Sequence, residues 1–235
     1  MTTMTDLRAE TAQANNALAV AGQTDMVWGH ASVRDPEGRG VWMKASEWGF
    51  EEVTPELVVL VDENGDVLAG SAKRHIEYPI HTEVMAARPD VGCVVHTHAP
   101  AATAFAALDV PLRALSHDGV PFAARDVPRF TRSGALIRSR ELGQALAETI
   151  GDGPGCLIPQ HGLVTVGVDA ATAVMHAVLL ERACRVQLTA MAAGPLARWS
   201  DDEEIALKLA EVWAPSQVRA GYGYLCRQIP GRRDS

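Results

Sequence analysis

Short apolar segments separated by tight turns are the feature of this sequence that most restricts its fold. Asn64-Gly65 stands between two such segments, and Asn-Gly in this position is the strongest local signal for a β-hairpin. Asp35-Pro36-Glu37-Gly38 separates two more and has the composition of a turn. The four segments are 27–33, 41–44, 57–61 and 67–68. The sequence therefore predicts hairpins, and with them a mixed or antiparallel sheet.

Helices are expected between the strands. Asp169 is placed to cap the longest of them, which runs to about residue 193. The expected helices are 6–21, 76–87, 101–107, 139–150, 169–193 and 201–213, and the further strands are 91–96, 112–116, 121–124, 155–158 and 163–166. This order predicts an α/β or α+β layered domain. No linker divides the chain, so one domain is expected over 1–235, with 216–235 as a C-terminal tail.

Composition excludes several classes of protein. Hydrophobic residues make up 47% of the chain, enough for a sizeable core, and the net charge is −8. An acidic chain without a basic run is a poor nucleic-acid binder. No apolar stretch reaches the roughly 18 residues of a membrane span, and the N-terminus does not resemble a secretory signal. The four cysteines are scattered, as in a reducing compartment, so we expect a cytoplasmic protein without nucleic-acid or membrane partners.

Three histidines indicate a metal site. His96-Thr97-His98 follows a predicted strand, and alternate residues of an extended segment point the same way. His161 lies in a turn between two apolar strands, and Gly162 after it allows a sharp turn or a close approach of the backbone. Three protein ligands with open positions are typical of a catalytic metal. The spacing alone is also compatible with polar strand ends.

Glu77 and His81 lie four residues apart on a predicted helix and would share one face. Glu77 is a candidate metal ligand or general base, and a solvated helix face is the alternative. His117, in Ser116-His117-Asp118-Gly119, is a lining residue or an ordinary loop histidine. His30 follows a strand-like run, and His75 precedes Glu77 by two residues.

The order of these motifs resembles the class II aldolase/adducin family, the group of fuculose-phosphate aldolase and ribulose-phosphate 4-epimerase. The resemblance covers roughly residues 6–215. The motifs are Gly29-His30-Ala31-Ser32, Glu77 with His81, Arg88-Pro89-Asp90, Val94-Val95-His96-Thr97-His98-Ala99 and Gln160-His161-Gly162-Leu163.

The resemblance implies a three-layer α/β/α fold around a mostly antiparallel sheet, and a homotetramer with active sites between subunits. It implies one divalent metal ion per subunit on His96, His98 and His161, with Glu77 as catalytic acid/base. Zinc and manganese are the expected ions, and three imidazoles also suit iron or cobalt. Whether Tyr222 or Tyr224 reaches a neighbouring site is left open.

Several residues depart from the sugar-phosphate members of the family. Those members place two serines just before the catalytic Glu, where this chain has His75-Ile76, and an asparagine where this chain has His30. Their hydroxyl-rich loop corresponds here to Lys44-Ala45-Ser46-Glu47-Trp48-Gly49. Groups suited to a phosphate dianion are thus largely replaced. The segment Gly29-His30-Ala31-Ser32-Val33-Arg34-Asp35-Pro36, together with Pro111-Leu112-Arg113 followed by His117, more closely resembles the branch that contains the pyridine-dicarboxylate decarboxylase.

The favoured hypothesis is a metal-dependent carbon–carbon lyase, a decarboxylase or aldolase, acting on a small non-phosphorylated hydroxy-carbonyl or hydroxy-carboxylate substrate. Its substrate-binding candidates are His30, Ser32, Lys44, His75, His81 and His117. A sugar-phosphate aldolase or 4-epimerase and a non-haem iron oxygenase with the same three histidines are the alternatives. A non-catalytic, adducin-like protein is disfavoured, because all three ligands and Glu77 are present.

Overall fold

The predicted hairpins are present in the structure, a computed structural model that describes residues 4–231. Strands β1 (His30–Arg34) and β2 (Val41–Lys44) pair antiparallel, as do β3 (Val58–Val61) and β4 (Val67–Ala69). With β5 (Cys93–Thr97), β6 (Gly155–Ile158) and β7 (Gly162–Gly167) they form one seven-stranded sheet in the order β4-β3-β2-β1-β5-β7-β6. Every pair of neighbouring strands is antiparallel.

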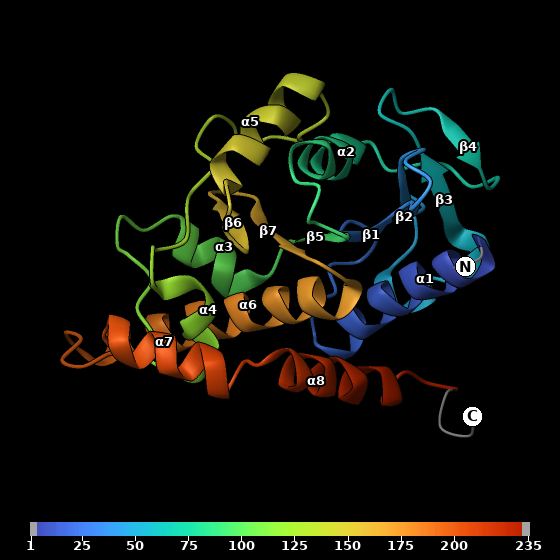
Figure 1. Ribbon diagram of the computed structural model, residues 1–235. Helices are drawn as coiled ribbons and strands as arrows, with labels where there is room; N and C mark the ends of the chain where they lie inside the picture. The colour runs from blue at the N-terminus through green and yellow to red at the C-terminus, as the bar shows by residue number, and fades with distance from the viewer. Residues whose placement is uncertain (1–3, 232–235) are drawn as a thin grey trace.

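Helices cover both faces of the sheet (Figure 1). The main helices are α1 (Met4–Val20), α2 (Tyr78–Ala87), α3 (Pro100–Ala106), α5 (Arg140–Ile150), α6 (Ala170–Ala193), α7 (Asp202–Glu211) and α8 (Pro215–Arg227). Shorter helices are α4 (Val120–Ala123), η1 (Phe50–Glu52), η2 (Pro55–Leu57) and η3 (His117–Gly119). The expected α/β/α layering with an antiparallel sheet is confirmed.

Alternation along the strands separates two hydrophobic cores. In β5, Cys93 and Val95 face the core shared with α1, α3, α6 and α8, whereas Val94 faces the core shared with α2 and α5. The Asp169 side chain caps α6 by accepting a hydrogen bond from the Thr172 backbone, as the sequence predicts. The middle strands of the sheet are thus buried on both faces, whereas the edge strand β4 is exposed.

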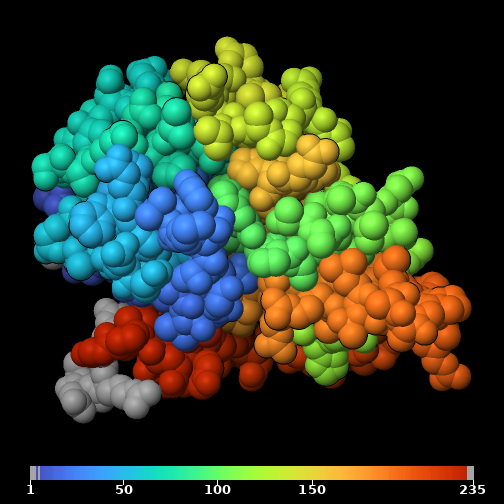
Figure 2. Space-filling view, turned by 180° about the vertical axis from the view of Figure 1, so that it is seen from behind, coloured from blue at the N-terminus to red at the C-terminus, as the bar shows by residue number. Residues whose placement is uncertain are grey.

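The C-terminal segment differs from the expected tail. Residues Pro215–Arg227 form helix α8, which packs on α6 and α1 and buries Val218 and Cys226. In the space-filling view the red helix α8 runs along the lower edge of the molecule (Figure 2). Residues 228–231 follow the helix without regular structure, and 232–235 lie outside the described residues.

The expected strands 112–116 and 121–124 are also absent. Residues 112–116 form neither helix nor strand, and Pro121 lies in the first turn of α4. Proline is tolerated at the start of a helix because no intrahelical N–H bond is lost there.

Candidate metal centre

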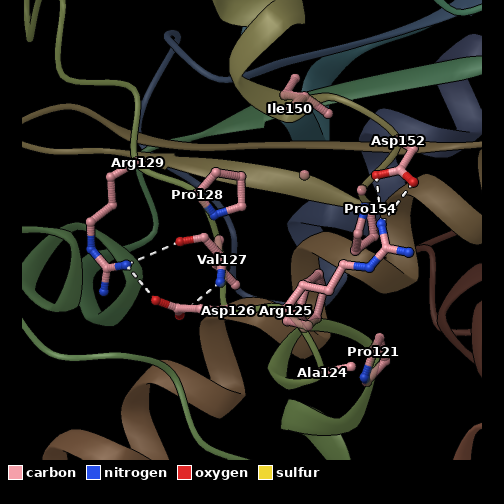
Figure 3. Close-up of a pocket in the computed structure, with 13 residues that line it drawn as sticks. Pro121, Ala124, Arg125, Asp126, Val127, Pro128, Arg129, Ile150, Asp152 and Pro154 are labelled. Atoms are coloured by element: carbon pink, nitrogen blue, oxygen red, sulfur yellow. Dashed lines mark hydrogen bonds and ion pairs between the residues drawn. The ribbon is translucent and has the colours of Figure 1, made fainter. Parts of the chain in front are cut away.

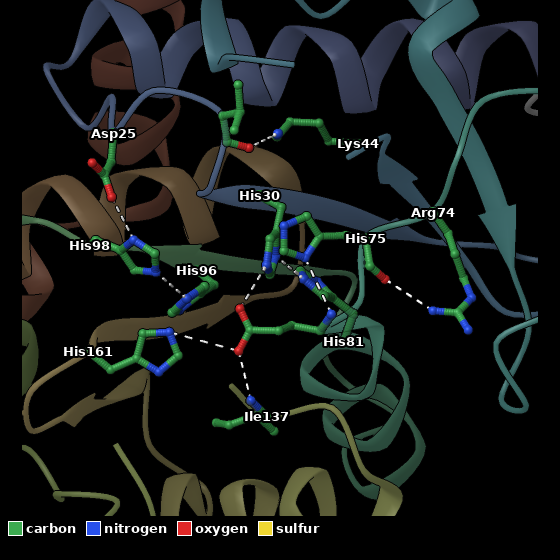
Figure 4. Close-up of polar contacts among 12 residues, drawn as sticks. Asp25, His30, Lys44, Arg74, His75, His81, His96, His98, Ile137 and His161 are labelled. Atoms are coloured by element: carbon green, nitrogen blue, oxygen red, sulfur yellow. Dashed lines mark hydrogen bonds and ion pairs between the residues drawn. The ribbon is translucent and has the colours of Figure 1, made fainter. Parts of the chain in front are cut away.

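The middle strands bring three histidines to one point. His96 is the fourth residue of β5, where it pairs with His30 of β1 and Val164 of β7. His98 follows one residue after β5 ends, and His161 lies in the turn before β7. Gly162 lies so close to β5 that a Cβ there would be 2.2 Å from the Thr97 carbonyl oxygen. This close approach lets the turn with His161 reach the histidines of β5 (Figure 4).

Hydrogen bonds fix the orientation of two of the three rings. His96 Nδ1 donates to the Leu163 carbonyl oxygen at 2.9 Å, and His98 Nδ1 donates to Asp25 Oδ2 at 2.6 Å. A neutral imidazole has one N–H, so both rings then present a bare Nε2. These two nitrogens lie 3.1 Å apart, where their lone pairs repel unless a cation lies between them.

The third histidine completes a donor set that fits a divalent metal. The ring of His161 lies 4.8 Å from that of His96 and 5.0 Å from that of His98, measured between centroids. One ligand atom from each residue lies within 4.8 Å of the others. Burial lowers the pKa of His161 to about 4 and that of His96 well below its usual value. Neutral nitrogens are therefore available at pH 7, as metal binding requires.

Glu77 lies beside this donor set but is held by the protein. Its Oε1 accepts a hydrogen bond of 2.8 Å from the Ile137 backbone N–H and lies 3.8 Å from His161 Nε2. Its Oε2 lies 3.8 Å from His30 Nε2. The side chain is buried, which raises its pKa. A carboxyl group in this position can exchange a proton with a molecule bound at the metal.

His30, His81 and Ser32 form a buried line behind Glu77. His30 Nδ1 lies 2.6 Å from His81 Nε2, and His81 Nδ1 lies 2.6 Å from Ser32 Oγ. Within residues 4–231, the His81 side chain is thus joined to the Glu77 carboxyl group through His30, whereas the sequence placed both side chains on one helix face. The reason is that α2 begins at Tyr78, so Glu77 precedes the helix. His81 is in α2 and points to β1.

His75 and Lys44 are two further buried polar residues close to His30. The His75 ring is 4.0 Å from the His30 ring between centroids, and its Nδ1 accepts a 3.3 Å hydrogen bond from the Glu77 backbone N–H. Burial, with Lys44 and His98 nearby, lowers the pKa of His75 to about 3. Lys44 Nζ donates to the carbonyl oxygens of Val27, Ala45 and Trp48. All three of its donors are therefore used by the backbone, although burial lowers its pKa to about 8.

Comparison with known proteins agrees with this geometry. The family model of the class II aldolase and adducin N-terminal domain matches residues 9–188. The chain belongs to this family. The resemblance drawn from the motifs is thereby confirmed.

Individual relatives include decarboxylases and aldolases. The decarboxylase NovR of Streptomyces niveus is 33% identical over 173 residues, which are 72% of this chain and 64% of NovR. The 4-hydroxy-3-prenylphenylpyruvate oxygenase/4-hydroxy-3-prenylbenzoate synthase of Streptomyces roseochromogenus subsp. oscitans is 33% identical over 72% of this chain and 62% of its own. The matches thus span less than two thirds of either relative. The L-fuculose 1-phosphate aldolase of Glaciozyma antarctica PI12 superposes with a TM-score of 0.84 and 26% identity, over 97% of this chain and 92% of that one.

His117, which the sequence analysis counted among the substrate-binding candidates, lies away from the histidine cluster. His117 begins η3, is exposed, and its carbonyl oxygen accepts a 2.7 Å hydrogen bond from Trp213 Nε1. No contact within residues 4–231 joins it to the other histidines. Tyr222 packs against the core and Tyr224 is exposed.

Two groups at the site escape sequence reasoning. Asp25 orients His98, and the backbone N–H of Ile137 holds Glu77. Asp25 lies in an irregular loop between α1 and β1, and a backbone N–H carries no side-chain signal. The only general signal for Asp25 is that a metal-binding imidazole usually donates its second N–H to a carboxylate or carbonyl oxygen.

A separate hollow of about 610 Å³ lies between α4 and the turn before β6 (Figure 3). Arg125 and Asp152 form an exposed ion pair of 2.8 Å there. This hollow contains none of the eight histidines.

In the part of the chain that the structure describes, no helix is long and apolar enough to cross a membrane.

Proposed function

We propose that this chain is a divalent-metal-dependent carbon–carbon lyase, a decarboxylase or aldolase, acting on a non-phosphorylated hydroxy-carbonyl or hydroxy-carboxylate compound. One observation carries the proposal. Three imidazoles form a complete donor set, and a buried carboxyl group lies beside them with its oxygen 3.8 Å from His161 Nε2. When bound, the ion supplies a Lewis acid for a substrate oxygen. Zinc or manganese is the expected ion.

The residues of the chain supply orientation and proton transfer. Asp25 and the Leu163 carbonyl hold His98 and His96 with Nε2 directed to the site. Glu77 is the general acid/base. When a bond to carbon dioxide or to an aldehyde breaks, the electron pair stays on the remaining carbon, and the Glu77 carboxyl group delivers a proton there. The Ile137 N–H keeps that carboxyl group in place.

The surroundings of Glu77 favour an unphosphorylated substrate. Ile76 has no side-chain donor, and the three N–H donors of Lys44 are already bonded to backbone carbonyls. A phosphate dianion would meet only neutral imidazoles near Glu77, since burial lowers the pKa values of His75 and His30. Each missing charge-assisted hydrogen bond is worth about 1.5–3 kcal/mol. A carboxylate needs fewer donors.

The test is a comparison of substrates with the zinc- and manganese-loaded enzyme. Fuculose 1-phosphate and ribulose 5-phosphate are compared with hydroxy acids and aromatic hydroxycarboxylates, with release of aldehyde or carbon dioxide as the signal. We expect turnover only of the unphosphorylated compounds. A kcat/KM of about 10⁴ M⁻¹s⁻¹ or more on a sugar phosphate would make the chain an ordinary aldolase or epimerase of this family.

A second candidate function is a non-haem iron oxygenase. It is favoured by the relative named as a 4-hydroxy-3-prenylphenylpyruvate oxygenase, at 33% identity. The same aromatic hydroxycarboxylates, given to iron-loaded enzyme with and without dioxygen, separate the two. Turnover that requires dioxygen supports the oxygenase, and equal anaerobic turnover supports the lyase.

The assembly and location of the protein are also proposals. We infer a homotetramer with active sites between subunits, as the family resemblance implies, in the cytoplasm. The exposed position of His117 is compatible with a role in a neighbouring subunit. Sedimentation of the metal-loaded protein tests the assembly, and a monomer would contradict it.

A further inference from the structure

The buried line behind Glu77 has a feature that its sequence motif does not reveal. Ser32, His81 and His30 are each fully buried, and the two contacts between them are 2.6 Å long. Figure 4 shows the rings of His30 and His81 next to each other. The outer nitrogen, His30 Nε2, is buried and has no hydrogen-bond partner. It lies 3.8 Å from Glu77 Oε2, beyond hydrogen-bond distance.

The positions of the protons on this line follow from counting donors. A hydrogen bond between two imidazole nitrogens needs one bare nitrogen and one N–H. In one arrangement Ser32 donates to His81 Nδ1, His81 Nε2 donates to His30 Nδ1, and the His30 proton is left on Nε2. In the reverse arrangement His30 Nδ1 donates to His81 Nε2, His81 Nδ1 donates to Ser32 Oγ, and His30 Nε2 is left without a proton.

The first arrangement is favoured because it satisfies Ser32. Within residues 4–231, the only hydrogen bond of the Ser32 hydroxyl is to His81. In the reverse arrangement this hydroxyl would receive the His81 proton and have no acceptor for its own, and buried O–H groups without acceptors are rare. Burial also lowers the pKa of His81 to about 3, which keeps the ring neutral. His30 is therefore left with an N–H directed toward Glu77.

His75 adds a second donor. Its Nδ1 accepts the backbone N–H of Glu77, so the neutral ring carries its proton on Nε2. The rings of His30 and His75 are 4.0 Å apart between centroids. Two neighbouring rings, His30 and His75, thus each carry one N–H donor.

We propose that Ser32 and His81 are positioning residues that fix His30 as an N–H donor, and that His30 with His75 binds a negatively charged carboxylate oxygen of the substrate. The substrate in this statement rests on the proposed lyase function, whereas the fixed proton on His30 does not. Ser32 and His81, which the sequence analysis grouped with the substrate-binding residues, then act only through His30.

The same reasoning argues against a second metal ion. One atom each of His30, His75 and Glu77 lies within 4.8 Å of the others, a spacing that suits an ion. A metal needs a lone pair on His30 Nε2, whereas the line places a proton there. A carboxylate oxygen can accept a hydrogen bond from that N–H and therefore matches this arrangement.

The direct test is neutron diffraction from crystals of the zinc-loaded protein grown in D₂O. We expect deuterium on Nε2 of His30 and of His81, with the Ser32 hydroxyl directed to His81. Deuterium on His30 Nδ1, or a second zinc between His30 and Glu77, would overturn the proposal. This result does not depend on any activity, so it stands or fails separately from the proposed function.

The kinetic test compares two buried hydroxyl groups of the sheet. Ser32→Ala removes the donor that fixes His81, and we expect KM for a carboxylate substrate to rise about tenfold, with zinc affinity changed less than twofold. The control is Thr165→Val, because the buried Thr165 hydroxyl donates to Ala173 O at 3.0 Å and, within residues 4–231, forms no hydrogen bond with a histidine. Unchanged KM in Ser32→Ala, or an equal rise in Thr165→Val, would contradict the positioning role.

Discussion

Asp25 provides the sharpest test of the metal centre, because it touches the site without being a ligand. Its Oδ2 accepts the Nδ1 proton of His98 at 2.6 Å. This contact fixes the tautomer that leaves His98 Nε2 bare, and a carboxylate partner makes the ring a better ligand. We predict that Asp25→Ala weakens zinc binding and leaves the fold intact.

The size of the effect follows from the exposure of the contact. Loss of such a partner costs about 10- to 100-fold in metal affinity, or about 1.4–2.8 kcal/mol at about 1.4 kcal/mol per decade. About a third of the Asp25 side chain, 32%, is exposed, and 22% of His98. Water can therefore replace part of the lost bond, and we expect the tenfold end of this range. Asp25→Asn keeps an oxygen acceptor and loses only the charge, so its effect is smaller.

The assay is competition for zinc against a chromophoric chelator, with far-ultraviolet circular dichroism to check the fold. Asp109→Ala is the matched control, because Asp109 is exposed in the loop after α3. His98→Ala removes a ligand and is expected to lose most of the bound zinc. An affinity of Asp25→Ala within twofold of the wild type would refute the orienting role. A loss as large as that of His98→Ala would make Asp25 a ligand itself.

Two further predictions concern the acid/base and the stability of the sheet. Glu77→Gln keeps an oxygen for the Ile137 N–H, so we expect full metal content with turnover reduced by roughly 10²-fold or more; lost metal would instead make Glu77 a ligand. Hydrogen bonds from Arg39 and Trp42 lower the pKa of Asp35, so its stabilisation is present above the unfolded pKa of about 3.9 and is lost as the pH falls through the folded value. Urea unfolding should show a free energy of unfolding about 1.5–3 kcal/mol lower for Asp35→Asn than for the wild type at pH 6. The free energy of the variant should also change less between pH 5 and pH 3. Parallel pH profiles of the two proteins would contradict this account.

The parts of the fold that the sequence predicts are those with local signals. The hairpin at Asn64-Gly65, the cap at Asp169 and the apolar strands β5 and β7 all lie where their patterns indicate. The sequence does not predict helix α8, because Gly221 and Gly223 each disfavour a helix by about 1 kcal/mol. Packing overrides that preference. A Cβ on Gly221 would be 2.8 Å from the Met175 side chain, so the glycine allows α8 to lie close to α6.

The same contrast between local sequence signals and long-range contacts holds for the candidate site. His96, His98 and His161 follow from the alternation of an extended strand and from a turn that needs glycine, and both are local rules. The roles of Lys44 and His81 depend instead on contacts that form only when the chain folds. Lys44 is occupied by three carbonyl oxygens, and His81 joins β1 from a helix that begins one residue after Glu77. A sequence identifies a polar side chain that folding buries, but only the structure shows which of its atoms remain unbonded. Within residues 4–231, His30 Nε2 and His161 Nδ1 are the buried histidine nitrogens without a hydrogen-bond partner, and the donor role proposed for His30 rests on the place of its Nε2 beside Glu77.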